Sequence, residues 1–203
     1  VIANFAINTE KIKGKKADFI EKSNDELSPD YLINYALNYA NGKRIKEGSL
    51  LLVIDECQLM FNAREWNVKG RAEWLSFFTQ HRKFGYDIIL VAQFDRMIDR
   101  QIRALIEYEQ VHRKVSNFGI KGKILSLIMG GNVFVSVKVW YPMKEKTGAD
   151  FFHARKKYYS LYDTFNMFGS GTGGGTGSPP VTEPDLLAVQ PDNNACVLDN
   201  NNT

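Results

Sequence analysis

The chain has 203 residues, of which 44% are hydrophobic, 12% aromatic and 24% charged, and its formal net charge is +3. This length and hydrophobic share suit one folded domain with a tail, and they exclude a chain that is disordered throughout. Two cysteines and three widely spaced histidines exclude a disulfide framework and a zinc site built from those residues. No apolar stretch reaches the roughly 18 residues that a membrane-spanning helix needs.

The charge is distributed unevenly along the chain. From residue 169 onward there are four acidic residues and no lysine or arginine. Residues 1–168 therefore carry a net charge of about +7, which suits a polyanionic partner such as a nucleotide, nucleic acid or anionic lipid. A lysine excess on a solvated face is the alternative explanation. The tail opens with GSGTGGGTGSPP, so we expect residues 169–203 to be a flexible linker and a disordered tail.

Apolar runs and helix signals alternate through the first half of the chain. Ser28-Pro29-Asp30 predicts a helix start, because serine caps free N–H groups and proline fits the first turn; Asn41-Gly42 predicts its end. The remaining predicted elements are a strand at 1–7, a loop at 8–27, a buried strand at 50–54, a helix at 71–83, a buried strand at 87–92 and a short helix at 98–106.

The next part of the chain predicts antiparallel strands. Residues 108–115 alternate like a half-exposed strand, and the runs at 124–128 and 133–140 flank Gly130-Gly131-Asn132, which indicates a hairpin. Buried strands that alternate with helices predict an α/β fold with a mostly parallel sheet, flanking helices and a late antiparallel hairpin.

The clearest chemical signal follows the strand at 50–54, in the segment LLLVIDECQ. Asp55 and Glu56 stand where this strand ends, and ligands of open α/β sheets bind at the carboxyl ends of strands. An apolar strand that ends in Asp-Glu is the Walker B pattern of P-loop ATPases. There the aspartate holds Mg²⁺, directly or through water, and the glutamate orients and deprotonates the attacking water. Two acids that only begin a solvated loop are the alternative interpretation, since the pattern is short.

Two further side chains extend this candidate site. The segment DIILVAQ ends at Gln93, and neighbouring parallel strands lie about 4.8 Å apart, so Gln93 comes within reach of the acidic pair if the two strands are neighbours. Arg82, near the end of the helix at 71–83, could bind a phosphate in cis or across a subunit interface. The alternatives are that Gln93 is an ordinary strand-end residue and that Arg82 complements the helix dipole.

Five segments together carry a family resemblance: VIANFAI, GSLLLVIDECQLMF, FFTQHRKFGYDIILVAQ, DRMIDRQIRALIEY and YYSLYDTF. Through them, residues 1–168 closely resemble the Zot family, the zonular occludens toxin-like assembly ATPases of filamentous phages, also called gene I proteins. The resemblance implies a P-loop NTPase domain that uses ATP and Mg²⁺ to drive virion assembly and export at the cytoplasmic face of the host inner membrane. By matching motif positions, it implies Asp55 and Glu56 as the Walker B acids and Gln93 as the sensor.

The resemblance also implies partners, namely further copies of the chain in a homo-oligomer, phage coat and export proteins, and the inner membrane. The family begins with a strand and a GxxGxGK(S/T) P-loop ahead of the VIANF strand, and neither Gly14-Lys15 nor GTGGGTG supplies that motif. The transmembrane helix of the family is also absent from the sequence. We therefore expect a soluble fragment that binds nucleotide poorly and is inactive as it stands. A DNA-handling packaging motor acting on phage DNA and a non-catalytic interaction module that has lost its P-loop are the alternatives.

Overall fold

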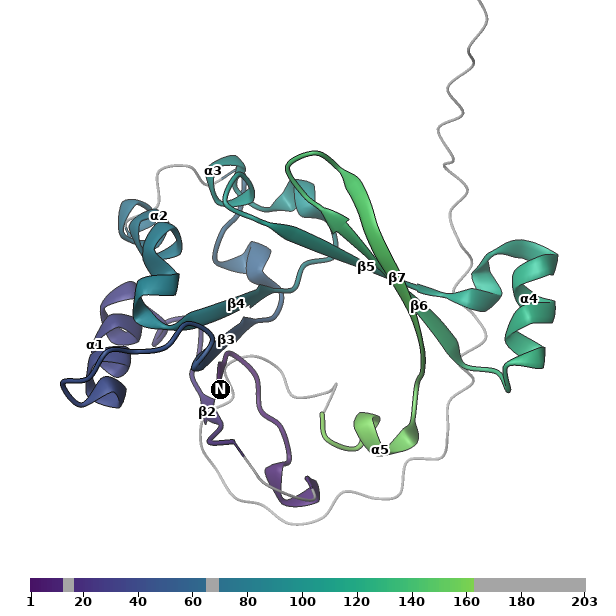
Figure 1. The fold of residues 1–203 in the computed structure, drawn as a ribbon, viewed down its shortest axis with the longest axis horizontal. Coiled ribbons are helices and arrows are strands. Elements are labelled where there is room, and N and C mark those ends of the chain that lie inside the picture. The colour runs from purple at the N-terminus through teal and green to yellow at the C-terminus, as the bar shows by residue number, and fades with distance from the viewer. Residues whose placement is uncertain (13–16, 65–69, 163–203) are drawn as a thin grey trace, which may run out of the picture. The chain divides into compact units, whose positions relative to one another are not determined.

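Two β-sheets organise the chain (Figure 1), and the computed structural model describes residues 1–12, 17–64 and 70–162. The first sheet is parallel, in the order β2-β1-β3-β4, and the second is antiparallel, in the order β5-β6-β7. The strands are β1 (Ile2–Ala3), β2 (Ile20–Glu21), β3 (Leu50–Ile54), β4 (Tyr86–Leu90), β5 (Tyr108–Lys114), β6 (Val133–Trp140) and β7 (Glu145–His153). The helices are α1 (Pro29–Ala40), α2 (Arg71–Gln80), α3 (Arg100–Arg103), α4 (Gly119–Ile128) and α5 (Lys156–Tyr159).

The predicted α/β class is confirmed, and the antiparallel strands form a sheet of their own. Gly14-Lys15 and the tail at 169–203 lie outside the described residues.

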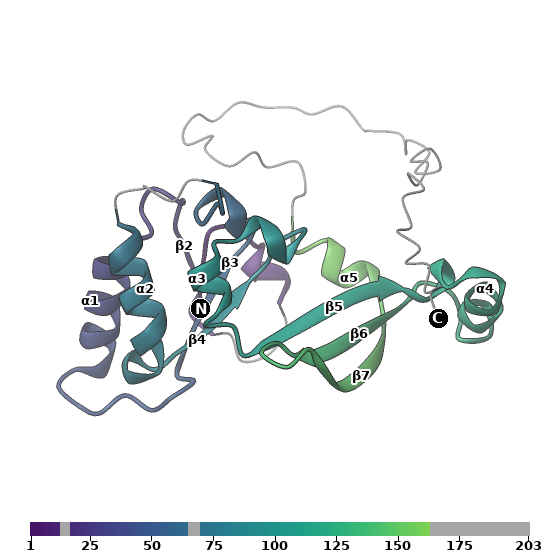
Figure 2. The same cartoon turned by 90° about the horizontal axis from the view of Figure 1, so that it is seen from above.

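The core of the parallel half lies between the sheet and helices α1 and α2, which are side by side in both views (Figures 1 and 2). In β3, Leu50, Leu52 and Ile54 are buried and the two intervening side chains are half-buried. The strand occupies the predicted residues, but its second face is only partly covered. The Tyr86 hydroxyl of β4 donates a hydrogen bond of 2.9 Å to the backbone oxygen of Leu32 in α1, which joins the sheet to the helix.

Helix α1 has the predicted ends. The Ser28 hydroxyl accepts a hydrogen bond of 3.1 Å from the backbone N–H of Tyr31, and Pro29 occupies the first turn. Asn41 ends the helix in the left-handed conformation with φ 46°. Helix α2 is shorter than the predicted 71–83, because a 3-10 turn at His81–Phe84 replaces its last residues before Gly85. No helix among the described residues is long and apolar enough to cross a bilayer.

The predicted hairpin at Gly130-Gly131-Asn132 is wrong. The run at 124–128 belongs to α4, and the glycines end that helix: the Gly131 N–H donates 2.7 Å to the Ser126 oxygen, and the Gly130 N–H 3.1 Å to the Leu127 oxygen. A short apolar run fits a helix or a strand equally well, and glycine serves both kinds of turn. The hairpin instead joins β6 to β7, a strand that the sequence did not reveal.

The N-terminal prediction also needs correction. Only Ile2–Ala3 of the predicted strand at 1–7 pairs with neighbours, and the predicted loop at 8–27 contains β2, which is parallel to β1. The predicted helix at 98–106 is reduced to the short helix α3. Asp99 caps the N-terminus of α3, because its side chain accepts a hydrogen bond of 2.8 Å from the Gln101 N–H. Short strands and single helical turns have too few residues to show a clear periodicity.

Candidate functional site

Asp55, Glu56 and Gln93 meet at the carboxyl edge of the parallel sheet. Strands β3 and β4 are parallel neighbours whose last residues, Ile54 and Leu90, are in register. Asp55 and Glu56 follow β3 directly, and Gln93 comes three residues after β4. The Gln93 side-chain nitrogen lies 3.5 Å from the Glu56 Oε1 atom. Because β3 and β4 are neighbours, the Gln93 side chain reaches Glu56 of the acidic pair, as the sequence predicts.

Two amide side chains and a left-handed backbone conformation position Glu56. Its φ of 46° lies in the left-handed region, which costs a non-glycine residue about 1 to 2 kcal/mol. The next residue, Cys57, is held beside the end of β4, because its N–H donates a hydrogen bond of 2.9 Å to the backbone oxygen of Val91. The Gln58 amide donates to the Glu56 Oε2 atom, while Gln93 faces Oε1. Both carboxylate oxygens are therefore oriented by neutral donors.

Gln58 and Cys57 were not anticipated from the sequence. Gln58 is buried, and its Oε1 atom has no hydrogen-bond partner among the described residues. Burial, with the Asp55 charge as a smaller cause, raises the pKa of the Cys57 thiol to about 12. The thiol therefore stays protonated at neutral pH and behaves as an apolar group under the acidic pair.

Asp55 is positioned through its backbone by the buried side chain of Asn4. The Asn4 Oδ1 atom accepts a hydrogen bond of 2.7 Å from the Asp55 backbone N–H. The Asn4 Nδ2 atom donates a hydrogen bond of 2.8 Å to the Asp55 backbone oxygen. The same Nδ2 atom donates 2.8 Å to the Asn24 Oδ1 atom. Asn4 follows β1, the other neighbour of β3, so three adjacent strands contribute to this edge. A polar residue straight after an apolar run is the only sequence signal for Asn4.

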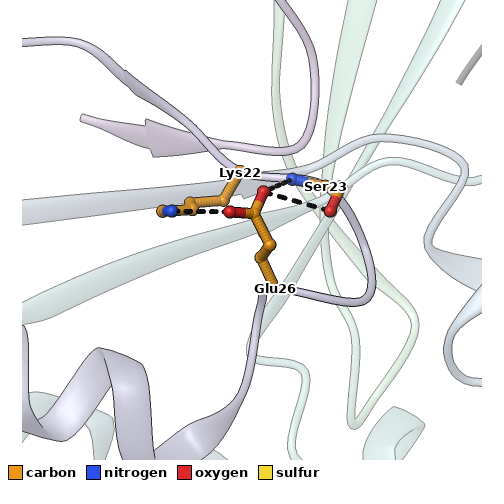
Figure 3. A network of polar contacts seen from close by, with 3 residues as sticks. All are labelled: Lys22, Ser23 and Glu26. Atoms are coloured by element: carbon orange, nitrogen blue, oxygen red, sulfur yellow. Dashed lines mark hydrogen bonds and ion pairs between the residues drawn. The ribbon is translucent and has the colours of Figure 1, made fainter. Parts of the chain in front are cut away.

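The turn that carries Asn24 is closed by a small polar network (Figure 3). The Glu26 carboxylate accepts hydrogen bonds from the Ser23 N–H, 3.0 Å, and the Ser23 hydroxyl, 3.1 Å, and pairs with the Lys22 ammonium at 2.8 Å. The Lys22 bond, followed by the two Ser23 bonds, lowers the pKa of Glu26 to about 2. The network therefore holds the turn that positions Asn24 beside Asn4.

Tyr162 approaches Asp55 from the C-terminal end of the described chain. Its hydroxyl lies 3.5 Å from the Asp55 Oδ2 atom, and its ring packs edge-on against Phe5. Burial, with the Asp55 charge and this contact, raises the pKa of Tyr162. The same tyrosine lines an open cavity of about 360 Å³ together with Ala6, Ile7, Asn8, Lys11, Ser160 and Leu161. Residues far apart in the sequence thus line this cavity, and Tyr162 links it to Asp55.

The site offers a cation carboxylate oxygens from one short segment. Among the described residues there is no group of three or more histidine, cysteine or acidic side chains that forms a metal site. The Asp55 Oδ1 atom accepts a hydrogen bond of 2.9 Å from the Glu56 N–H, and the Tyr162 hydroxyl lies 3.5 Å from Oδ2. A Mg²⁺ ion commonly uses one or two carboxylates and takes its other oxygens from water and phosphate, which fits this donor set.

Arg82 lies at the other end of the sheet. It belongs to the 3-10 turn before β4, and the nearby Gly85 oxygen accepts a hydrogen bond from the Leu50 N–H at the start of β3. A five-residue strand, roughly 13 Å long, separates that edge from Asp55. The Arg82 guanidinium pairs with Glu47 at 3.3 Å and with Glu107 at 2.5 Å. The structure therefore does not bring Arg82 to the acidic pair within one chain.

Comparison with known proteins matches the Zot family, described as zonular occludens toxin, to residues 8–163. This match covers more than half of the chain. The chain belongs to the Zot family. Its curated relatives include the Gene 1 protein of Enterobacteria phage M13, 33% identical over 129 residues that represent 59% of this chain and 37% of the relative. The Gene 1 protein of Escherichia phage If1 is 31% identical over 153 residues, which are 71% of this chain and 43% of the relative.

The Zot-family chain thus spans less than half the length of these two Gene 1 proteins. Among solved structures, it is similar to the N-terminal domain of zonular occludens toxin from Neisseria meningitidis, with 20% identity, a TM-score of 0.46, and coverage of 80% of this chain and 78% of the other. It is also similar to the genome packaging NTPase of Sulfolobus turreted icosahedral virus 2 in complex with ATP-gammaS. That likeness has 11% identity, a TM-score of 0.40, and coverage of 74% and 80%.

Proposed function

We propose that this Zot-family chain provides the metal-binding and water-activating half of an ATPase that drives filamentous phage assembly and export. The observation that carries the proposal is the meeting of Glu56 and Gln93, at 3.5 Å, beside Asp55 at one edge of a parallel sheet. Membership of the family that includes phage Gene 1 proteins supports it. The place of action under this proposal is the cytoplasmic face of the host inner membrane, and the partners are further copies of the chain and phage coat and export proteins.

Each residue of the site has a distinct role in this proposal. Asp55 would hold Mg²⁺ with its carboxylate, whose position Asn4 fixes through the Asp55 backbone. Bound Mg-ATP supplies the phosphoryl group and the charge that the metal neutralises. Glu56 accepts the proton of a water molecule, and Gln58 and Gln93 orient its two oxygens for that task.

The 203-residue chain by itself should bind ATP weakly. Its sequence contains no GxxGxGK(S/T) segment, so the backbone N–H groups and lysine that hold β- and γ-phosphates are missing. Two carboxylates offer only negative charge to a polyanion. A micromolar affinity for Mg-ATP, measured by calorimetry on this chain, would contradict the expectation.

The test of the proposal uses a longer form that carries the P-loop segment of the family ahead of Val1. Glu56→Gln should bind Mg-ATP normally and hydrolyse it about 10² to 10⁴ times more slowly, because an amide cannot accept the proton. Asp55→Ala should weaken the Mg²⁺-dependent part of nucleotide binding. Gln93→Ala should spare binding and reduce turnover. Glu73→Gln, on the exposed side of α2, is the matched control and should change neither quantity.

Other results would favour the remaining functions. Turnover of Glu56→Gln at the parental rate would place the base elsewhere and refute the site. Hydrolysis that rises several-fold with phage DNA would favour a DNA-handling motor. The positive net charge of residues 1–168 suits DNA as a partner. Absence of hydrolysis in the longer form would favour a non-catalytic interaction module. An effect of Arg82→Ala on turnover in an oligomer, but not on nucleotide binding, would assign Arg82 to the site of a neighbouring copy.

A further inference from the structure

Helix α4 exposes a continuous row of aliphatic side chains. Four of them are more than half exposed: Ile120 at 77%, Ile124 at 55%, Leu127 at 80% and Ile128 at 76%. With 3.6 residues in each turn, these positions fall within an arc about 100° wide on one side of the helix. We call these four residues the α4 apolar face.

The opposite side of α4 attaches the helix to the antiparallel half of the chain. Gly122 and Ser126 are buried there, and a Cβ atom on Gly122 would lie 2.3 Å from the Val115 oxygen. The helix backbone therefore packs directly against the 3-10 turn at Val115–Asn117. Because this contact fixes α4 from one side, the α4 apolar face is on the side of the helix away from the buried Gly122 and Ser126. Figures 1 and 2 show α4 beyond the antiparallel sheet, between the end of β5 and the start of β6.

Positive charge surrounds the α4 apolar face. On a helical projection Lys123 flanks one border of the arc and Lys121 the other. The segment 113–132, which holds α4 and the turn before it, contains four lysines and arginines and no acidic residue. At the start of the helix, the Arg113 guanidinium lies over the half-exposed Phe118 ring, 5.9 Å from its centre. An apolar helix face with lysines along its borders is complementary to a partner that has an apolar layer with negative charge at its surface.

We propose that α4 is a membrane-interface helix that binds bilayers containing anionic lipids. Its apolar face enters the boundary between headgroups and acyl chains, while Lys121 and Lys123 extend to the lipid phosphates. A second copy of the chain fits less well, because a symmetric contact would bring the same lysines against one another. The contact would be made by the described domain itself, and it does not depend on the proposed ATPase activity.

The experiment is sedimentation of the 203-residue chain with vesicles of phosphatidylcholine alone or with phosphatidylglycerol added. The chain should bind the anionic vesicles and not the neutral ones. Lys121→Gln with Lys123→Gln should lower the partition coefficient about thirtyfold, since each surface cation contributes roughly fivefold. Ile120→Gln with Leu127→Gln should lower it at least about tenfold through the lost apolar burial.

Matched variants keep the test specific. Leu37→Gln with Tyr39→Gln removes exposed apolar groups from α1, and Lys43→Gln with Lys46→Gln removes two exposed lysines; neither should change binding. All substituted positions are at the surface, and circular dichroism checks that each variant folds. Equal binding by the α4 variants and the parent chain would overturn the proposal.

Two other occupants have their own signatures, and either would overturn the proposal. Self-association without lipid that Ile120→Gln with Leu127→Gln abolishes would identify a second copy as the occupant. Vesicle binding that appears only after deletion of residues 169–203 would identify the acidic tail, whose apolar cluster lies at 186–189, as the group that covers α4 in the intact chain.

Discussion

At the scale of single residues, the site depends on side chains that perform no chemistry themselves. Asn4 uses both ends of its amide on the backbone of Asp55, and it is 5% exposed, so water cannot easily replace it. Gln58 similarly orients the Glu56 carboxylate from a buried position. Because the acidic pair is only partly buried at the sheet edge, these fixed amides supply the preorganisation that the site needs.

Replacement of Asn4 by alanine should destabilise the fold. The Asp55 N–H and oxygen would lose their partners, and buried unsatisfied groups cost about 1 to 3 kcal/mol each. We expect Asn4→Ala to lower the free energy of unfolding by about 2 to 4 kcal/mol, measured by urea denaturation. Asn34→Ala, on the exposed face of α1, is the control and should change it by less than about 0.5 kcal/mol. Similar values for both variants would show that the Asn4 amide does not hold Asp55.

The Glu26 network predicts a defined pH dependence. Folding lowers the pKa of Glu26 from an ordinary value of 4.5 to about 2. A carboxylate with a lowered pKa stabilises the fold fully above its unfolded value and loses that contribution as the pH falls through its folded value. The stability difference between the parent chain and Glu26→Gln should therefore be constant above about pH 5 and disappear between about pH 4.5 and pH 2.

Thermal unfolding of both proteins across this pH range provides the measurement. Asp25→Asn, at the neighbouring exposed acid of the same turn, is the control. A difference between the parent and Glu26→Gln that persists at pH 2 would mean that the ionised carboxylate is not what holds the turn.

At the scale of elements, the connection from α2 to β4 is tightly constrained. Gly85 has φ +74°, and a Cβ atom there would lie 2.0 Å from a methyl carbon of Ile45 and 2.9 Å from the Lys46 oxygen. The backbone at this turn thus approaches the loop before β3 more closely than a side chain would allow. This close approach sets where β4 begins beside β3, and so determines the register that brings Gln93 to Glu56.

A pair of glycine variants separates the two costs at this turn. Gly42 has nearly the same φ, +75°, and a Cβ atom there would have no other atom within 4 Å, so Gly42→Ala should cost only the left-handed strain of about 1 to 2 kcal/mol. Gly85→Ala should cost about 1 to 3 kcal/mol more, because it adds a steric overlap. Urea denaturation compares the two variants. Equal losses would show that the Ile45 loop moves aside without cost.

At the scale of the whole molecule, the described residues contain two apolar clusters of unequal size. The larger one spans the parallel sheet and α1 to α3 and includes Leu52 and Phe77. The smaller one, under the antiparallel sheet, consists of Val115, Val133 and Val135 with Met129 and Val137 packed against it. Since local stability follows the amount of buried apolar surface, the antiparallel half should open more readily than the parallel half.

Hydrogen exchange tests this difference. Amides of β3 should be the best protected, because β3 pairs on both sides within the larger cluster, and amides of β5 and β7 should exchange faster. Val133→Ala should accelerate exchange in β5, β6 and β7 by about tenfold and leave β3 unchanged, since its cavity lies in the smaller cluster. Uniform acceleration in both sheets would show that they unfold as one cooperative unit.

The sequence alone determined the features that depend on neighbouring residues. Ser28 and Asn41 define both ends of α1, because capping involves groups only three or four residues apart. The apolar run 50–54 forms β3 at the predicted residues and places Asp55 and Glu56 at its end. The same reasoning brought Gln93 to the site, since parallel neighbours end at a common edge.

The tertiary structure decided what depends on distant partners. The bond between Asn4 and Asp55 joins positions 51 residues apart, and no local pattern specifies such a contact. Arg82 lies at the far end of the sheet, which follows from the direction of β4 and not from the basic sequence around it. Gly130-Gly131 ends a helix because α4 finds a packing surface at Val115, and that surface exists only once β5 and β6 are paired. Local hydrogen bonding thus set the elements, and long-range burial set their partners.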